Sequence, residues 1–291
     1  MTPSYCGRFA PSPTGPLHLG SIVAALASYL DARRNRGRWS VRIDDLDPPR
    51  TIKGADTLIL NELERLGLEW DGPVIYQSHG TEGYEAAVQK LLREGSAFHC
   101  GCTRREVGRR RYLGTCRAGI PAGRFPRSVR ARVECDSTIE FSDRFQGSYT
   151  IDLSRSIGDF IIKRADNVPA YHLATVLDDY ALGVTDVIRG ADLLEPTAPQ
   201  LHLMRLLNLD APRYGHVPVA LDDHQRKLSK AAAAQATSTS PPQSVLLAVL
   251  RFLNQPLPED ARDTAVAELL TDAVEAWDPS AVSRVREAVL E

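Results

Sequence analysis

A loop rich in proline and glycine, RFAPSPTGPLHLGS at residues 8–21, carries the first residues whose types and spacing could do chemistry. It follows a β-favouring run at residues 5–10 and precedes residues 22–34, whose Ala- and Leu-rich pattern predicts a helix. A strand, a tight loop and a helix N-terminus form an arrangement that binds phosphate, and Gly15 and Gly20 would let the backbone approach a ligand closely. Alone, the loop could equally be an ordinary turn.

A histidine and a pair of lysines extend this phosphate hypothesis. His18 would stand at the mouth of the predicted helix, where it could donate to a phosphate oxygen. Far along the chain, the segment KLSK places Lys227 and Lys230 on a predicted loop. Alone, such a pair carries no meaning. Together with HLG it indicates a cationic loop that closes over a triphosphate, where positive charge stabilises the transition state.

Charged residues follow two predicted strands. Asp44 comes directly after RWSVRI at residues 38–43, and ligands of strand–helix–strand folds lie beyond the carboxyl ends of the strands. Asp44 would then contact a substrate ammonium, with a solvated turn as the alternative. Arg189 lies near the end of another predicted strand, residues 183–190, and could clamp a carboxylate with two parallel bonds. A structural salt bridge is the alternative there.

Three of the five cysteines lie within seventeen residues, namely Cys100, Cys102 and Cys116. Zinc prefers four nitrogen or sulfur ligands in a tetrahedron, so this clustering suits a metal in a reducing cytosol better than a disulfide framework. Three buried thiols are the alternative. The spacing leaves the fourth ligand open between His99, Tyr112 and Cys135. Otherwise Cys6 and Cys135 are expected to be ordinary buried residues.

The composition is that of a soluble globular enzyme with room for two domains. The chain has 291 residues, of which 43% are hydrophobic and 25% charged, and its net charge is −2. No apolar run reaches the roughly 18–20 residues of a membrane helix, and no secretory signal precedes the first strand. We therefore expect a cytoplasmic protein without a membrane partner.

Positive charge is concentrated in one stretch of the chain. Residues 104–132 hold ten arginines and a single acidic residue, Glu106, whereas residues 241–291 hold nine acidic and four basic residues. Most charge runs are solvated faces, but this one has a single sign, lies beside the cysteines and contains Tyr112 and Phe125. That combination predicts a surface for RNA phosphates.

The loop and the KLSK segment together resemble the paired motifs of class I aminoacyl-tRNA synthetases. HLGS stands where that family has HIGH, and KLSK where it has KMSKS. RFAPSPTGPLHLG is close to the glutamyl-tRNA synthetase form, and DFIIKR at residues 159–164 and PAYHLATVLDD at residues 169–179 are similar to glutamyl segments. The resemblance implies an α/β fold, with a Rossmann-like catalytic domain built on a parallel sheet, an inserted α+β subdomain that contains zinc, and a small C-terminal helical unit.

The resemblance also implies substrates and a set of site residues. The substrates are L-glutamate and ATP, the latter with Mg²⁺. The implied catalytic residues are His18, Lys227 and Lys230, and the implied ATP-binding residues are Gly15, His18, Gly20 and Lys230. The implied glutamate-binding residues, with either arginine free to take either carboxylate, are Arg8, Ala10, Ser12, Asp44, Tyr171 and Arg189. The family pattern Cys-x-Cys followed by Tyr-x-x-x-Cys implies one closed, structural Zn²⁺ site made of Cys100, Cys102, Tyr112 and Cys116.

The resemblance implies a division of the chain into three parts. Residues 1–75 and 170–235 would form the catalytic domain, residues 76–169 the inserted acceptor-type subdomain, and residues 236–291 the small helical unit in place of an anticodon-binding domain. This short C-terminus and the cysteine–tyrosine pattern resemble a branch of the family that transfers glutamate to queuosine at the wobble position of tRNA(Asp), independently of the 3′ end. The expected RNA partner is the anticodon stem-loop, and we expect a monomer.

Three alternatives stay open at this point. One is an ordinary glutamyl- or glutaminyl-tRNA synthetase with a truncated C-terminus. The second is a nucleotidyltransferase of the same fold that joins small molecules and never touches RNA, against which the arginines and cysteines argue. The third is a non-catalytic RNA-binding module derived from a synthetase, against which His18, Lys227 and Lys230 argue.

Overall fold

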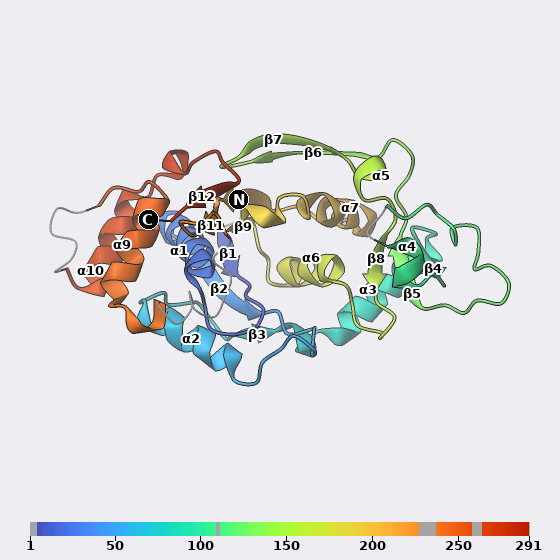
Figure 1. The fold of residues 1–291 in the computed structure, drawn as a ribbon, viewed down its shortest axis with the longest axis horizontal. Helices are drawn as coiled ribbons and strands as arrows, with labels where there is room; N and C mark the ends of the chain where they lie inside the picture. The colour runs from blue at the N-terminus through green and yellow to red at the C-terminus, as the bar shows by residue number, and fades with distance from the viewer. Residues whose placement is uncertain (1–4, 109–110, 227–236, 258–263, 291) are drawn as a thin grey trace.

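The computed structural model describes residues 5–108, 111–226, 237–257 and 264–290. Figure 1 shows an elongated molecule with the C-terminal helices at one end and a small sheet at the other. The helices are α9 (Pro242–Phe252) and α10 (Val266–Ala276), and the sheet contains β4 (Ala97–Cys100), β5 (Ser128–Ala131) and β8 (Phe160–Lys163). None of the helices in the described ranges is long and apolar enough to span a membrane.

The predicted strand, loop, helix and strand at the N-terminus are confirmed. They are β1 (Cys6–Phe9), α1 (Leu19–Arg34) and β2 (Arg38–Ile43), and α2 (Ala55–Arg65) connects them to β3 (Ile75–Tyr76). β2 pairs in parallel with both β1 and β3. Helix α1 begins at Leu19, three residues before the predicted start, because the side chain of His18 caps it by accepting from the backbone nitrogen of Ser21.

The second sheet has the order β7–β6–β10–β9. Its strands and connecting helices are β6 (Thr138–Asp143), β7 (Gly147–Asp152), α5 (Leu153–Ser156), β9 (Asp186–Gly190), η2 (Ala191–Leu193), α7 (Thr197–Leu207) and β10 (Arg213–Val217). β10 is parallel to β9 and to β6, while β6 and β7 form an antiparallel hairpin that runs along the top of Figure 1 toward α5. The backbone nitrogen of Thr185 donates to the carbonyl of Cys6 at 2.9 Å, which ties the start of β9 to β1.

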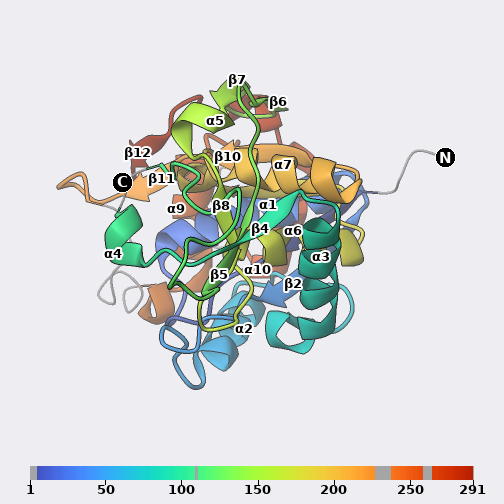
Figure 2. The same ribbon diagram turned by 90° about the vertical axis from the view of Figure 1, so that its right-hand side faces the viewer.

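The third sheet is antiparallel, in the order β4–β5–β8, and the sequence patterns of residues 128–133 and 159–164, which favour strands, form β5 and β8. The helices near it in the chain are η1 (Gln77–His79), α3 (Thr81–Arg93), α4 (Arg104–Val107) and α6 (Tyr171–Ala181). Figure 2, which views the molecule from this end, shows α3 to one side of the sheet and α7 above it. One apolar core lies between this sheet, α6 and α7.

The C-terminal part differs from the prediction at its end. The sequence patterns of residues 245–253 and of residues near 281–290 both predict a helix; the first is confirmed as α9, but the second prediction is wrong. That segment contains a short turn, η3 (Pro279–Ala281), and a strand, β12 (Glu287–Val289), which pairs in parallel with β11 (Val219–Leu221). The free edge of β11 explains the difference, because pairing with a distant strand overrides local helix propensity.

Helix α1 lies at the centre of the larger core and holds a buried carboxylate. The apolar side chains of α1 pack with Trp39 of β2 and with residues of α9 and α10. Asp31 on α1 is fully buried and accepts from the Trp277 indole at 2.9 Å, from Arg144 at 2.9 Å and from the Tyr5 hydroxyl. The N-terminal loop therefore stands on a helix that is fixed from several sides.

Candidate active site and metal cluster

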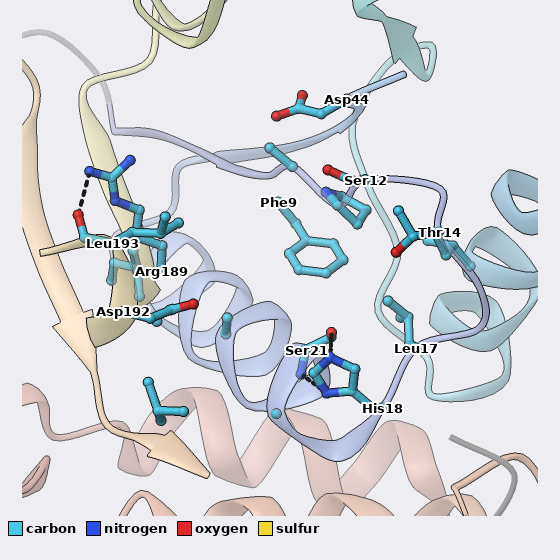
Figure 3. A pocket seen from close by; sticks show the side chains of 18 of the residues that line it. Phe9, Ser12, Thr14, Leu17, His18, Ser21, Asp44, Arg189, Asp192 and Leu193 are labelled. Atoms are coloured by element: carbon cyan, nitrogen blue, oxygen red, sulfur yellow. Dashed lines mark hydrogen bonds between the residues drawn. The ribbon is translucent and has the colours of Figure 1, made fainter. Parts of the chain in front are cut away.

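One cavity of about 360 Å³ gathers the substrate-site residues that the sequence predicts and the structure describes. It lies between the loop after β1, the N-terminus of α1, the end of β2, the start of α6 and the turn from β9 into η2 (Figure 3). The predicted residues on its wall are Arg8, Ala10, Ser12, Gly15, His18, Gly20, Asp44, Tyr171 and Arg189. Lys227 and Lys230 lie outside the described residues.

His18 presents a defined tautomer at the base of this cavity. Its Nδ1 accepts from the backbone nitrogen of Ser21 at 3.2 Å, so the ring proton of the neutral form is on Nε2. Nε2 lies 3.1 Å from the Ser21 hydroxyl. Dashed lines in Figure 3 mark the bonds between these two residues. Gly15, in the loop before it, has φ +144°, a backbone conformation that other residues rarely adopt. The loop thus brings an N–H donor and open helix amides to one place.

Arg8, Arg42, Asp44 and Asp179 form a buried ionic chain, which we call the ionic wall. Nε and Nη2 of Arg8 donate to the two carboxylate oxygens of Asp179 at 3.1 and 3.2 Å. Arg42, fully buried on β2, donates to Asp179 at 2.6 Å and to Asp44 at 2.7 Å. The charge of Arg8 is therefore already balanced by a protein carboxylate, and Arg42 fixes the orientation of Asp44.

The pKa values of the two acids of the ionic wall are shifted in opposite directions. Burial opposes ionisation of Asp179, but Arg8 and Arg42 outweigh it and hold its pKa below the ordinary value. Burial raises the pKa of Asp44 in spite of the attraction of Arg42. Of the two carboxyl groups, Asp44 is thus the one whose ionised form is stabilised more when another positive group, such as a substrate ammonium, comes close.

Arg189 stands on the other side of the cavity among uncharged partners, which together form the neutral wall. It is only 5% exposed, and its Nε donates to His216 Nε2 at 3.0 Å. Its Nη2 donates to three further acceptors, the oxygens Thr197 Oγ1 at 2.9 Å, Gln200 Oε1 at 2.8 Å and Leu193 O at 3.2 Å. Among the described residues Nη1 has no hydrogen-bond partner. A buried guanidinium with neutral contacts is prepared to receive an anion.

Tyr171 connects this cavity to a larger one beside the third sheet. Its side chain is 42% exposed at the start of α6, and it lines both the substrate cavity and a second cavity of about 820 Å³. Arg104, Arg127 and Arg164 also line the larger cavity. The wall of the larger cavity holds four arginines against two aspartates, and this excess of positive charge suits an RNA backbone.

The predicted zinc residues meet in a compact cluster beyond β4. The Sγ atoms of Cys100, Cys102 and Cys116 all lie within 4.8 Å of one another, with Cys102 and Cys116 at 3.8 Å. Zn–S bonds of about 2.3 Å in a tetrahedron place two sulfurs roughly 3.8 Å apart. The Tyr112 hydroxyl oxygen is 3.4 Å from Cys100 Sγ and 3.7 Å from Cys102 Sγ. The three cysteines are thus compatible with a zinc ion, and the Tyr112 hydroxyl lies beside them.

The other candidates for the fourth ligand are not in this cluster. His99 precedes Cys100 on strand β4, where alternate side chains point to opposite faces, and it is exposed whereas Cys100 is buried. Cys135 is exposed, so its prediction as a buried residue is wrong, whereas Cys6 is buried as expected. Cys135 follows β5 in a solvent-facing turn, which the apolar character of cysteine could not reveal.

The arginine run is divided between structural and exposed roles. Arg117 bonds to the carboxylate of Asp159 at 2.6 Å, and the buried Arg130 stacks on the Tyr112 ring 4.0 Å from its centre and donates to Cys100 Sγ. The exposed arginines are Arg104, Arg105, Arg111, Arg124 and Arg127, while Arg109 and Arg110 lie outside the described residues. Tyr112 is buried in the cysteine cluster, so Phe125, at 81% exposed, is the aromatic side chain of the run that an RNA base could reach.

Sequence reasoning did not assign roles to Arg42, Asp179 or His216. An arginine inside a buried strand needs a carboxylate partner, and that rule could have identified Arg42. The partner could not be predicted, because Asp179 lies 137 residues further along the chain. His216, in the strand RYGHV, gives no local signal that distinguishes it from an ordinary core histidine.

Comparison with known proteins gives one consistent family. Residues 6–241 match the model of the tRNA synthetases class I (E and Q) catalytic domain. A glutamyl-Q tRNA(Asp) synthetase of Aromatoleum aromaticum is 45% identical over 98% of this chain and 93% of its own length. One of Dechloromonas aromatica is 46% identical over 98% of this chain and 97% of its own length.

A solved structure supports the same fold. A glutamate tRNA ligase from Elizabethkingia meningosepticum, crystallised in complex with its amino acid, superposes with a TM-score of 0.83 at 23% identity, over 99% of this chain and 67% of that one. The predicted α/β fold of a class I synthetase catalytic domain is thereby confirmed. The chain belongs to the class I tRNA synthetases (E and Q), in the branch of the glutamyl-Q tRNA(Asp) synthetases.

Proposed function

We propose that this chain activates L-glutamate with ATP and transfers it to queuosine at the wobble position of tRNA(Asp). The observation that carries the first step is the meeting, in one cavity, of a helix N-terminus suited to phosphate at His18 and a buried cation without a charged partner among its contacts at Arg189. The near full-length relatives named for this transfer support the second step.

The placement of the groups orients the glutamate. Its α-carboxylate must face ATP, and therefore the N-terminus of α1 and His18, because that carboxylate reacts. Arg189 lies across the cavity from His18 (Figure 3), so it takes the side-chain carboxylate. Asp44 faces the ammonium, while Ala10, Ser12 and Tyr171 complete the wall. Arg8 shapes the site through its bond with Asp179.

The proposed chemistry has two balanced steps. An oxygen of the α-carboxylate attacks the α-phosphorus of ATP, and pyrophosphate leaves. A hydroxyl of the cyclopentene ring of queuosine then attacks the carbonyl carbon, loses its proton, and AMP leaves as the ester forms. His18, through Nε2–H, and the cations Lys227 and Lys230 stabilise the charge that develops on the phosphates, as does the Mg²⁺ that accompanies ATP.

We further propose that Cys100, Cys102, Tyr112 and Cys116 hold one zinc ion. The sulfur spacing and the phenol oxygen support this assignment, and four protein ligands leave no open position for chemistry. The ion would fix the loops that carry the arginines. It has no part in adenylate formation.

The RNA partner in this proposal is the anticodon stem-loop, bound by a monomer. The exposed arginines beside the cavity of about 820 Å³ would hold its phosphates next to Tyr171. We further propose that the chain is divided into a catalytic domain (residues 1–75 and 170–235), an inserted subdomain (residues 76–169) and a C-terminal unit (residues 236–291).

One experiment separates this function from its alternatives. Labelled glutamate should be transferred to tRNA(Asp) that contains queuosine, to its isolated anticodon stem-loop, and to tRNA(Asp) without its 3′-terminal CCA. Queuosine-lacking tRNA(Asp) is the matched control and should remain unlabelled. Glutamate found on the 3′ adenosine, with no label on the stem-loop, would make the chain an ordinary glutamyl-tRNA synthetase.

A further inference from the structure

A buried histidine and a buried aspartate stand behind Arg189. His216, on β10, is fully buried, and its Nε2 lies 3.0 Å from Arg189 Nε. Its Nδ1 lies 2.5 Å from Asp143 Oδ2, at the end of β6. The line Asp143–His216–Arg189 therefore leads from the β6–β7 hairpin to the amino-acid cavity, although Asp143 does not line that cavity.

Arg189 fixes the donor and acceptor roles along this line. A guanidinium N–H can only donate, so His216 Nε2 must accept, and the ring proton must be on Nδ1, from which it is donated to Asp143. Burial lowers the pKa of His216, which keeps the ring neutral and Nε2 free to accept. Burial opposes ionisation of Asp143, but the hydrogen bonds from His216 and from backbone nitrogens outweigh it and lower its pKa.

The second oxygen of Asp143 holds the carboxylate in place. Oδ1 accepts from three backbone nitrogens, those of Phe145 at 3.0 Å, Gln146 at 2.9 Å and His216 at 3.0 Å. Only Oδ2 is left for the imidazole. The carboxylate of Asp143 is thus held in a fixed orientation. Because an ionised carboxylate can only accept hydrogen bonds, the ring nitrogen of His216 that faces it must carry the proton.

We propose that Asp143 and His216 are positioning residues for glutamate selection. Asp143 sets the tautomer of His216, and His216 holds Arg189 so that Nη1 stays unpaired for the substrate carboxylate. This inference rests on the proposed activation of glutamate and extends it to two residues outside the substrate's reach. It gives the β6–β7 hairpin a direct part in amino-acid recognition.

The replacement Asp143→Asn tests the tautomer without removing volume. Its amide can donate to His216 Nδ1, which moves the ring proton to Nε2 and sets it against Arg189 Nε–H. An amide at this position of a buried Asp–His pair is known to favour the wrong tautomer. The KM for glutamate in ATP–pyrophosphate exchange should rise about tenfold or more, the size of a lost hydrogen bond to a charged group. The KM for ATP should change less than about twofold.

Two further variants separate positioning from general damage. Asp152→Asn, on the same hairpin, replaces the partly exposed cap of α5 and should leave both KM values unchanged. His216→Leu keeps a buried side chain of similar size but has neither a donor nor an acceptor whose order could be inverted. In that background Asp143→Asn should therefore add less than about a twofold effect on the glutamate KM. Effects that multiply would overturn the inference, because Asp143 would then act by another route.

A measurement that needs no substrate completes the test. Nitrogen-15 NMR of the full chain should show His216 protonated at Nδ1 in the parent and at Nε2 in Asp143→Asn. An unchanged tautomer, or glutamate and ATP KM values that rise together, would overturn the inference. A parent that does not activate glutamate would overturn the proposed function and the selection role, while the NMR result would still decide whether Asp143 controls His216.

Discussion

The two walls of the substrate cavity hold their arginines in opposite ways. In the ionic wall, Arg8 and Arg42 share the carboxylate of Asp179, and Arg42 also pairs with Asp44, so both positive charges have partners within the protein. In the neutral wall, Arg189 contacts an imidazole, a hydroxyl, an amide and a carbonyl, and its Nη1 has no partner among the described residues. A buried charge without a counterion is costly, so the second wall gains stability when an anion binds. The ionic wall fixes the shape of the substrate cavity, and the neutral wall selects an amino acid with a side-chain carboxylate.

The largest expected effect is the loss of stability that follows when the ionic wall is broken. Asp179→Asn leaves two buried arginines without their shared charge, which should lower the free energy of unfolding by about 3–5 kcal/mol. Glu195→Gln removes an exposed partner of Arg286 and should change it by less than about 1 kcal/mol. Denaturant titration measures both. An Asp179→Asn variant as stable as the parent would show that the ionic wall is not structural.

Variants of His18 and Lys230, which belong to neither wall, test the catalysis of adenylate formation separately from amino-acid binding. His18→Ala and Lys230→Ala should each slow adenylate formation by roughly 10²–10³, because each removes a group that acts on charge in the transition state. Lys230→Ala should keep the free energy of unfolding close to that of the parent, and His18→Ala should lower it by no more than the roughly 0.5–2 kcal/mol of a lost helix cap. ATP–pyrophosphate exchange gives the rates, and activity within a few-fold of the parent for both variants would remove these residues from the catalytic set.

The cysteine cluster should be separable from both walls. The purified chain should contain about one zinc, and Cys102→Ser or Cys116→Ser should lose it and loosen the surrounding loops while glutamate activation persists in part. Metal analysis of protein from zinc-replete cultures tests this, and metal-free parent protein would refute the site. Tyr112→Phe is sharper, since equally tight zinc in that variant would exclude the phenol as a ligand.

The smallest effect is expected on the RNA side. Arg104→Glu, in the wall of the larger cavity, should weaken transfer several-fold and reduce its salt dependence, because fewer counterions are released. The neighbouring, exposed Arg105 does not line that cavity, so Arg105→Glu is the matched control and should matter less. Adenylate formation should be nearly unchanged in both. Equal losses of transfer activity in the two variants would indicate that RNA binds to a diffuse positive surface and not in the larger cavity.

The contrast between the walls also shows what a sequence can and cannot predict. Local patterns were sufficient for the strand, loop and helix around His18, and the family motifs led to the residues that line the cavity. The partners of these residues were not predictable, since Asp179 and His216 reach Arg8 and Arg189 only through the tertiary fold. The same reason explains β12, where a segment with a helical pattern pairs instead with the edge of β11.

The most direct test of the two-wall account is amino-acid choice. Exchange rates with glutamate and glutamine should be measured for the parent, for Arg189→Gln and for Arg213→Gln, which replaces an exposed arginine of the same sheet. If Arg189 takes the side-chain carboxylate, the parent should favour glutamate by roughly 10² or more, from the few kcal/mol of a charged hydrogen bond. Arg189→Gln should bring that preference close to unity, and Arg213→Gln should keep it. A preference that survives the loss of Arg189 would contradict the assignment.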